Sequence, residues 1–317
     1  MRRAFLALAL LHAGCWEGAD VSLGDLPRAT PDGGPGSECP AGGEAVTATM
    51  SAFLSECAGF GCSAIGGMRG CVYHVTSLAD AGPGTLRDGA EREGALWIVF
   101  DVAGAIDLQS SVQLQSNKTI DGRGVSVTLR GYGLLLGTGR SNVVIENMSF
   151  ANGANVDNND AIQIADASRV WIDHGTFSSF GDGLVDITRG ATDVTVSWSL
   201  FANHPLVMLI GRSADDTGDA NIRVTAHHNW WNQTGSYAPR ARFGKVHTFN
   251  NLIDRWKDSA SSITMGGQLF SEANIFVAGD EKDAVSTSQG SDPLPGKARS
   301  SGDWLQNGAV VHENEPD

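Results

Sequence analysis

The chain has 317 residues, of which 40 are glycine, 41% are hydrophobic and only 18% are charged. This composition excludes a disordered chain, which lacks hydrophobic residues, and a coiled coil, which needs abundant charged helix formers. The formal net charge of −14 excludes the basic footprint of a nucleic-acid-binding protein, so we expect no nucleic-acid partner.

The amino terminus has the pattern of an export signal over residues 1–15. Two arginines precede an apolar run, and Ala13-Gly14-Cys15 supplies an exit of small residues. Small residues before a cysteine are typical of a lipoprotein signal, in which Cys15 would carry a lipid anchor. Ordinary secretion is the alternative, because His12 stands where that signal usually has an aliphatic residue. Both interpretations predict export, to the medium, the outer surface or the periplasm.

The rest of the chain divides into a linker and one domain. Residues 16–40 are rich in Gly, Pro and Asp and have no apolar period, which predicts a flexible linker. We expect a single folded domain over residues 41–317. Its tail from about residue 278 is polar and turn-rich, and we expect it to wrap the exterior or to be partly disordered. No motif indicates an oligomer, so we expect a monomer.

Four cysteines besides Cys15 fall in the first quarter of the chain. They are Cys39, Cys57, Cys62 and Cys71. An even number in an exported protein indicates two disulfides, for which three pairings exist. We favour Cys62–Cys71 together with Cys39–Cys57. A zinc site would need paired two-residue spacings, which these cysteines lack.

An eight-residue segment recurs between residues 118 and 276. The clear copies are VVIENMSF, VWIDHGTF, VTVSWSLF, VTAHHNWW and VHTFNNLI, which start at Val143, Val170, Val194, Val224 and Val246. Weaker copies start at Lys118 and Leu269. Inside each copy the apolar residues alternate, which is the period of a β-strand.

This repeat predicts an all-β, single-stranded parallel β-helix. Starts 22 to 30 residues apart suit short coils that must stack, because one coil cannot bury its inner face alone. A propeller blade would need a repeat of about forty residues, and the pattern of leucine-rich repeats is missing. The glycine content then reflects tight turns, whose backbone angles Gly and Asn adopt most cheaply.

A group of acidic residues falls where neighbouring coils would stack. Asp160 and Asp182 are about one period apart, and Asp182 and Asp186 share one side of an extended segment. Asn158 shares the side of Asp160. Oxygens of this kind suit a hard cation such as Ca²⁺. The alternative is that these are ordinary solvated turn residues.

A basic group follows in YAPRARFG, at residues 237–244. The strand period places Arg240 and Arg242 on one side, where they could face the acidic group and bind the carboxylates of a polyanionic sugar. The alternative is that both arginines only neutralise neighbouring acidic side chains. We interpret the histidines of the repeats as stacking residues, with a catalytic or zinc cluster as the alternative. These histidines are His174, His204, His227, His228 and His247.

Longer motifs surround the repeat. In chain order they are GFGCSAIGGMRGCVYHVTSLADAGPGTLRDGA, WIVFDVAGAIDL, SNKTIDGRG, SNVVIENMSF, WIDHGTFSS, DGLVDITRGATDVTVSW, MLIG and HHNWWNQTGSYAPRARFGKVHTFNN. With these motifs the chain resembles the pectate lyases of polysaccharide lyase family 1 over roughly residues 59–275. The resemblance implies a right-handed, pectin-lyase-like β-helix, export, Ca²⁺ as cofactor and β-elimination of polygalacturonate, an acidic polysaccharide.

The resemblance also implies roles for the acidic group. In similar enzymes calcium is held by carboxylates at the positions of Asp160, Asp182 and Asp186. A further acidic residue stands where this chain has Asn158, so the calcium site here lacks one charge.

Two more departures affect the basic side of the implied site. The proton-abstracting arginine of the family's Arg-x-Pro-x-x-Arg motif is replaced by Tyr237, whereas the second arginine, which binds a substrate carboxylate, matches Arg242. The family's substrate-binding lysine follows a histidine by two positions, and after His204 that position holds Leu206.

Three functions follow from this sequence. The first is a secreted lyase with Tyr237 as the proton-abstracting group. Arg240 would assist this step, and Arg242 would stabilise the phenolate of Tyr237. Arg242, Lys245 and His204 would bind the substrate. The second is a catalytically inactive β-helix that binds acidic polysaccharide at the cell surface. The third is a polygalacturonate hydrolase, because paired Asp residues also serve glycoside hydrolysis.

Overall fold

The computed structural model describes Cys39 and residues 43–314. The predicted signal segment and Cys15 lie outside the described residues, as does the predicted linker apart from Cys39. No helix in the described part is both long and apolar enough to cross a membrane.

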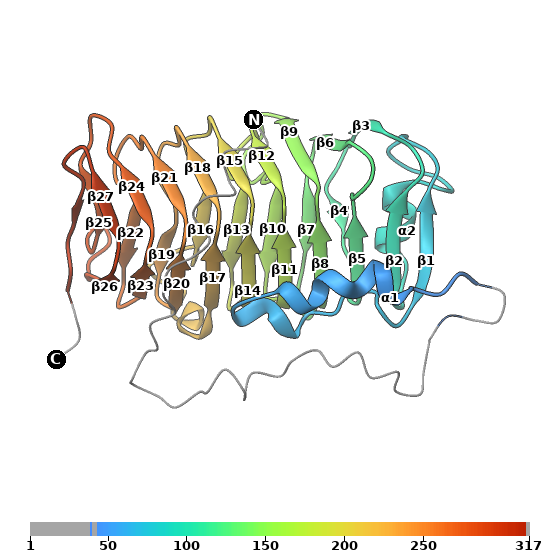
Figure 1. Cartoon of the computed structure of the whole chain (residues 1–317), viewed down its shortest axis with the longest axis horizontal. Helices are drawn as coiled ribbons and strands as arrows, with labels where there is room; N and C mark the ends of the chain where they lie inside the picture. Colours follow the sequence, from blue (N-terminus) through green and yellow to red (C-terminus); the bar gives the residue numbers. More distant parts are fainter. Residues whose placement is uncertain (1–38, 40–42, 315–317) are drawn as a thin grey trace.

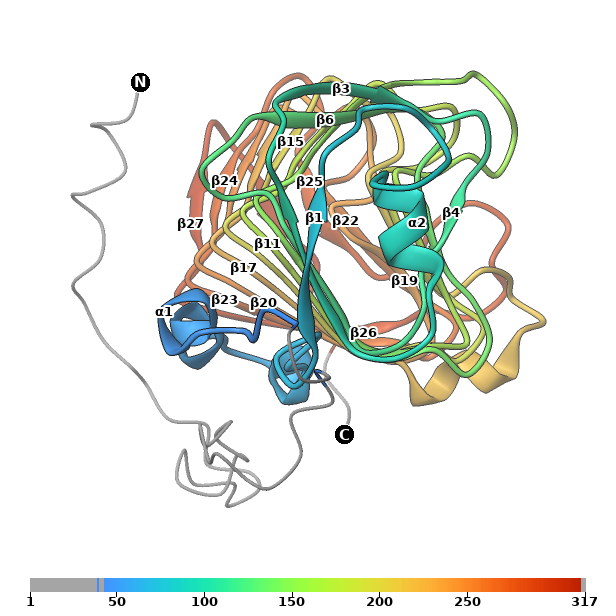
Figure 2. The same ribbon diagram turned by 90° about the vertical axis from the view of Figure 1, so that its right-hand side faces the viewer.

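The chain winds into a stack of coils, which confirms the predicted parallel β-helix (Figure 1). Within the described residues three parallel sheets hold ten, nine and nine strands, and nearly every coil gives one strand to each sheet. Figure 2 looks along the stack and shows the sheets as the sides of a roughly triangular section.

The three sheets are named here in the order in which each coil enters them. The first sheet contains β1 (Cys71–Val75), β2 (Leu96–Phe100), β5 (Lys118–Asp121), β8 (Ser141–Glu146), β11 (Ser168–Asp173), β14 (Thr192–Ser197), β17 (Arg223–His227), β20 (Lys245–Phe249), β23 (Gln268–Glu272) and β26 (Lys297–Ser301). The second sheet contains β3 (Gly104–Asp107), β6 (Val127–Gly131), β9 (Ser149–Gly153), β12 (Thr176–Ser178), β15 (Leu200–Ala202), β18 (Trp230–Asn232), β21 (Leu252–Asp254), β24 (Ile275–Val277) and β27 (Trp304–Gln306). The third sheet contains β4 (Val112–Gln113), β7 (Leu134–Leu136), β10 (Ile162–Ala165), β13 (Val185–Thr188), β16 (Met208–Ile210), β19 (Arg240–Arg242), β22 (Ser261–Thr264), β25 (Asp283–Ser286) and β28 (Val310–Val311).

The pairing register of the first sheet confirms the sequence repeat residue by residue. Each octet start pairs with the start of the next octet, in the row Lys118, Val143, Val170, Val194, Val224, Val246 and Leu269. Because the side chains of a strand alternate, this row and its alternate neighbours bury one face inside the stack.

Ladders of like side chains hold successive coils together. Inside the stack, Phe150, Phe177 and Phe201 lie one above another with ring centroids 4.9 Å apart, close to the spacing of the strands themselves. At the turn from the first to the second sheet, Asn251 Nδ2 donates to Asn274 Oδ1 at 2.8 Å. Such ladders satisfy buried polar groups where the strands end.

The same turn has left-handed backbone in residues other than glycine. The row Asn147, His174, Trp198, His228 and Asn250 has φ between 50° and 56°. Glycine is instead required where backbones approach closely. A Cβ on Gly67 would lie 1.9 Å from the carbonyl oxygen of Leu96.

An amino-terminal segment covers the outside of the first sheet. It contains α1 (Ala48–Ser51), η1 (Ala52–Glu56) and η2 (Phe60–Ser63), and it packs on Trp97, Val144 and Trp171. At the open end of the first coil, α2 (Leu86–Glu91) lies across the interior and buries Leu86 (Figure 2).

The predicted disulfide pairing is wrong. The bonds join Cys39 to Cys71 and Cys57 to Cys62, with Cα–Cα distances of 4.7 and 5.4 Å. Ala45 forms an antiparallel bridge with Cys71, so the start of the chain runs beside β1 and brings Cys39 to it. Cys57 directly follows η1 and Cys62 lies within η2, so this bond closes the short connection between the two elements.

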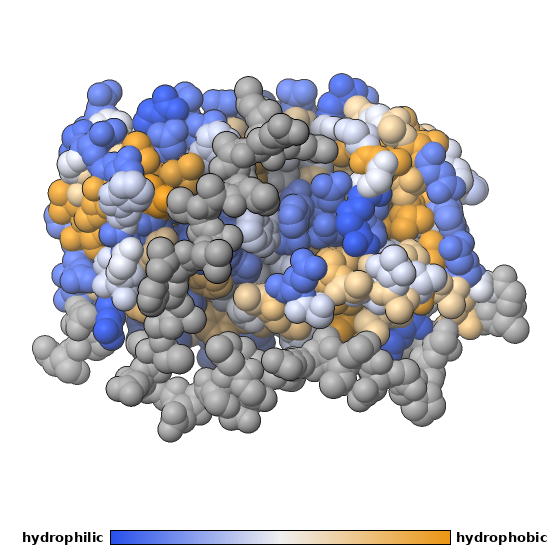
Figure 3. All heavy atoms as spheres, in the orientation of Figure 1, coloured by the Kyte–Doolittle hydropathy of each residue, from blue (hydrophilic) through white to orange (hydrophobic). Residues whose placement is uncertain are grey.

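The prediction for the tail is also wrong. From residue 283 onward the chain continues the stack, and β25, β26, β27 and β28 extend all three sheets. The last coil exposes Trp304 and Leu305 of β27, and Figure 3 shows an apolar patch at this end of the stack. Residues 287–296 connect β25 to β26 and lie against the end of β22, where Met265 N donates to Leu294 O at 2.8 Å.

Candidate active site

The predicted acidic group comes together at the turns that lead into β10 and β13. Asp160 precedes β10, and Asp182 and Asp186 belong to the next coil, before and within β13. The backbone N–H of Asn158 donates to Asp182 Oδ2 at 3.1 Å. The N–H of Gly183 donates to Asp160 Oδ1 at 2.7 Å. The sequence prediction that these residues gather on neighbouring coils is therefore confirmed.

Gly183 leaves a space between two of these carboxylates. A Cβ on Gly183 would lie 2.6 Å from Asp186 Oδ1 and 2.8 Å from Asp160 Oδ1. Burial raises the pKa of Asp160 to about 6. The pKa of Asp186 is raised well above its usual range, first by burial and then by the charges of Asp160 and Asp182. Oxygen ligands around a small space, with uncompensated negative charge, fit a calcium ion.

His204 supports the acidic group through the backbone. Its Nε2 lies 2.6 Å from the carbonyl oxygen of Asp182, and its side chain is buried. Burial lowers the pKa of His204, so the neutral ring donates to that carbonyl. The structure thus places His204 where it holds the Asp182 turn in position.

The basic group lies on the same sheet, two strands along the stack. Asp186 of β13 pairs with Leu209 of β16, and Leu209 pairs with Arg240 of β19. Neighbouring strands are about 4.8 Å apart, so the Cα atoms of Asp186 and Arg240 are separated by roughly 10 Å. Acidic and basic groups therefore share one surface of the third sheet.

Asp292, which the sequence prediction did not include, pairs with both arginines and cancels one of their two positive charges. Its carboxylate accepts from Arg240 Nη2 at 3.0 Å and from Arg242 Nε at 2.9 Å. Thr264 Oγ1 donates to it at 2.7 Å. Burial raises the pKa of Asp292, but the hydrogen bonds from Thr264, Arg240 and Arg242 outweigh it and the pKa is lowered. The arginines thus pair with a carboxylate from the segment 287–296, and not with the acidic group that they were expected to face.

Tyr237 contacts a different arginine from the one expected. Arg240 Nη1 donates to Tyr237 Oη at 2.7 Å, and the guanidinium carbon lies 5.1 Å from the ring centroid. The expectation that Arg242 assists the phenolate is corrected accordingly. Leu206, which the sequence analysis placed at the position of the family's lysine, forms an isolated parallel β-bridge with Ser236 on the coil that carries Tyr237.

Lys245 does not join the basic group. It is exposed and begins β20 of the first sheet, after the chain has turned away from β19. There it borders a shallow surface depression with Thr192, Asn221 and Arg223. Lys245 therefore lies on a different face from Asp292.

The comparisons with known proteins point to one family. A sequence model of a family described as pectate lyase matches residues 100–304. Pectate lyase 1 of Chamaecyparis obtusa is 38% identical to the chain over 255 residues, which cover 73% of this chain and 68% of that protein. The chain belongs to the pectate lyase family.

Solved structures of this family share the fold. Jun a 1, the major allergen from cedar pollen, matches with a TM-score of 0.78 and 32% identity, over 86% of this chain and 88% of that one. Bsp165PelA, a pectate lyase from Bacillus sp. N165, matches with a TM-score of 0.71 and 26% identity, over 82% of this chain and 90% of that one. That structure is a complex with trigalacturonate.

Two residues of the candidate site were missed from the sequence. Gly183 could have been found, because a glycine between Asp182 and Asp186 in DGLVDI is the residue that leaves room between the carboxylates. Asp292 had no such signal. It lies 50 residues after Arg242, in a segment that belongs to none of the repeated octets.

Proposed function

We propose that the chain is an exported polysaccharide lyase that cleaves polygalacturonate or a related uronan by calcium-assisted β-elimination. The observation that carries this proposal is the acidic group around Gly183 and the arginine pair of β19 on one face of the third sheet. A cation site beside paired guanidiniums suits a polyanionic sugar. The trigalacturonate bound to Bsp165PelA supports the same class of substrate.

The elimination removes a proton from the carbon next to a sugar carboxylate and expels the glycosidic oxygen from the neighbouring carbon. Calcium bound by Asp160, Asp182 and Asp186 would supply positive charge to the substrate carboxylate. Tyr237 Oη takes the proton in this proposal. Arg240 donates to that oxygen at 2.7 Å and so stabilises negative charge on it.

Arg242 is the group that binds the substrate carboxylate in this proposal. Its Nε is used by Asp292, and its Nη1 donates to the carbonyl oxygen of Arg212 at 3.0 Å. The described residues offer Nη2 of Arg242 no hydrogen bond, so this nitrogen is the donor left for a sugar carboxylate.

A second function, a binding protein without catalysis, is favoured by the same geometry. Asp292 already pairs with both arginines and cancels one of their two charges, and Leu206 brings no charge where the family's lysine would stand. Such a site would hold a uronan through its cation without activating the proton. The two disulfides suit export, whether by lipid attachment at Cys15 or by ordinary secretion.

A panel of uronans separates these functions. A lyase with Ca²⁺ produces unsaturated sugar ends that absorb in the ultraviolet, and a chelator abolishes the increase. A hydrolase produces reducing ends without that absorbance, and a binding protein produces neither.

The role of Tyr237 has its own test. Tyr237→Phe should lower the elimination rate at least a hundredfold, which is the usual contribution of a general base. The matched control is Tyr73→Phe, since Tyr73 lies in β1 and bonds Asp88 instead. Full activity of Tyr237→Phe would show that another group takes the proton.

A further inference from the structure

A second cluster of metal-ligating side chains lies on another corner of the coils. Glu146 ends β8, Asp173 ends β11, and His174 follows in the turn to the second sheet. One ligand atom from each residue lies within 4.8 Å of the other two. The calcium-type group lies at the opposite end of the second-sheet strands, where the chain enters the third sheet. The two clusters are therefore separate sites.

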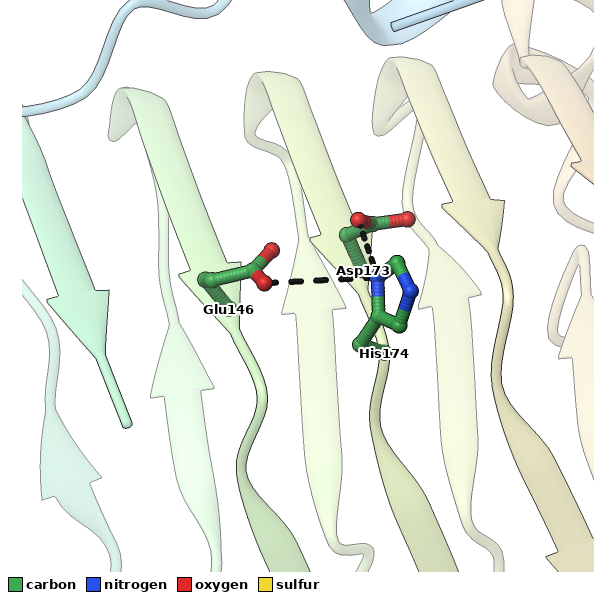
Figure 4. A group of neighbouring side chains, drawn as sticks. All are labelled: Glu146, Asp173 and His174. Atoms are coloured by element: carbon green, nitrogen blue, oxygen red, sulfur yellow. Dashed lines mark hydrogen bonds and ion pairs between the residues drawn. The ribbon is translucent and has the colours of Figure 1, made fainter. Parts of the chain in front are cut away.

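The side chains of this cluster point toward one another (Figure 4). His174 Nδ1 lies 2.6 Å from Asp173 Oδ2 and 4.0 Å from Glu146 Oε1. In a tetrahedral zinc site, ligands about 2.1 Å from the metal are about 3.4 Å from each other. In a zinc complex the first distance would widen and the second would shorten.

Glu146 carries the strongest indication of a missing ligand. Its side chain is 6% exposed, and its Oε2 has no hydrogen-bond partner within the described chain. Buried polar atoms almost always have a partner, so an unpaired carboxylate oxygen in a cluster needs an explanation. A bound cation would provide that partner.

Neighbouring side chains hold two members of the cluster in position. Ser197 Oγ donates to Asp173 Oδ1, and Trp171 Nε1 donates to Ser197 Oγ at 2.8 Å. The ring of His174 is stacked on that of Trp198, with centroids 6.1 Å apart. Metal ligands are typically fixed by such outer contacts. The side chain of His174 is half exposed, so the cluster borders solvent.

We propose that Glu146, Asp173 and His174 form a binding site for a divalent transition metal of the zinc type, which links the coils of β8 and β11. Two carboxylates and one imidazole are a donor set that zinc accepts, with a fourth position left for water. Calcium is a poor occupant because it takes oxygen ligands.

The test is zinc binding to the full exported chain after removal of metals with a chelator. The chain is kept in excess Ca²⁺, so that the calcium-type group is occupied, and zinc stoichiometry and affinity are measured by calorimetry at pH 7.5. Cobalt(II) provides a second measurement, because tetrahedral coordination with a histidine gives visible absorbance. We expect one zinc per chain and an affinity at least tenfold weaker in Glu146→Gln and in His174→Gln.

The matched control is His74→Gln. His74 also lies between two carboxylates, but Asp101 contacts its Nδ1 at 2.8 Å and Glu44 its Nε2 at 2.9 Å, so these ligands cannot converge on one ion. This variant should bind zinc like the wild type. The proposal is overturned if the chain binds no zinc, if Glu146→Gln and His174→Gln bind it unchanged, or if Asp182→Asn removes the binding.

Discussion

Replacing Asp292 by alanine should destabilise the protein more than replacement of any exposed acidic partner. The side chains of Asp292, Arg240 and Arg242 are 6%, 10% and 14% exposed, so all three charges are largely removed from water. Asp292→Ala leaves two buried guanidiniums without their carboxylate. Removing one member of a buried ion pair costs about 3–5 kcal/mol of unfolding free energy.

Urea unfolding followed by tryptophan fluorescence measures this cost. The control is Asp107→Ala, which removes the partner of Arg130 in an ion pair that is 61% exposed on the aspartate side. That variant should unfold like the wild type, because exposed ion pairs contribute little. If Asp292→Ala unfolds at the wild-type urea concentration, or Asp107→Ala is equally destabilised, the buried pairing does not stabilise the fold.

The pH dependence of the Asp292 effect has a definite sign. The hydrogen-bonded carboxylate has a lowered pKa, so the unfolded chain takes up its proton first as the pH falls. The stability that Asp292 contributes is therefore present above the ordinary Asp pKa of about 3.9 and is lost below it. The difference between wild type and Asp292→Ala should be constant from pH 5 to 7 and shrink in stronger acid.

Three further predictions concern the cation site and the stack. Gly183→Ala places a methyl group between Asp160 and Asp186 and should abolish calcium-dependent protection against unfolding, with the calcium-free stability nearly unchanged. Burial lowers the pKa of Lys118 to about 8, so between pH 8 and 10 the unfolded chain binds more protons than the folded chain. The free energy of unfolding should therefore rise over that range by up to about 3 kcal/mol. Lys118→Met should lose this rise. Asn251→Ala interrupts the asparagine ladder and should cost about 2–3 kcal/mol in urea unfolding, whereas a neutral result would mean that water replaces the amide.

The fold could be predicted because every coil has to bury its apolar inner face against the neighbouring coils. Val143, Val170 and Val194 are spaced by the length of a coil and fill equivalent places in the core, so the sequence alignment is also the strand register. The acidic group followed from the same logic, since residues one period apart must lie near each other. What repeats in the structure repeats in the sequence.

Contacts that occur once could not be found in this way. The pairing of Cys39 with Cys71 depends on a single antiparallel bridge at Ala45, whereas the stacked strands are parallel. The position of Asp292 depends on the path of the connection between β25 and β26, which has no counterpart in other coils. Its polar composition indicated only a surface segment, because one buried carboxylate does not alter composition.

The charges of the candidate site predict the order in which a divalent ion and a uronate would bind. The net charge of −14 repels a polyanion at long range, and Asp292 cancels one of the two arginine charges that would oppose this repulsion. The carboxylates around Gly183 add negative charge at the place where a uronate would bind. In the proposed reaction a divalent ion would cancel most of this negative charge, so it would have to bind before the sugar does. In this proposal Arg242 would orient the sugar through one directed hydrogen bond, and its attraction for the sugar would be weakened by Asp292.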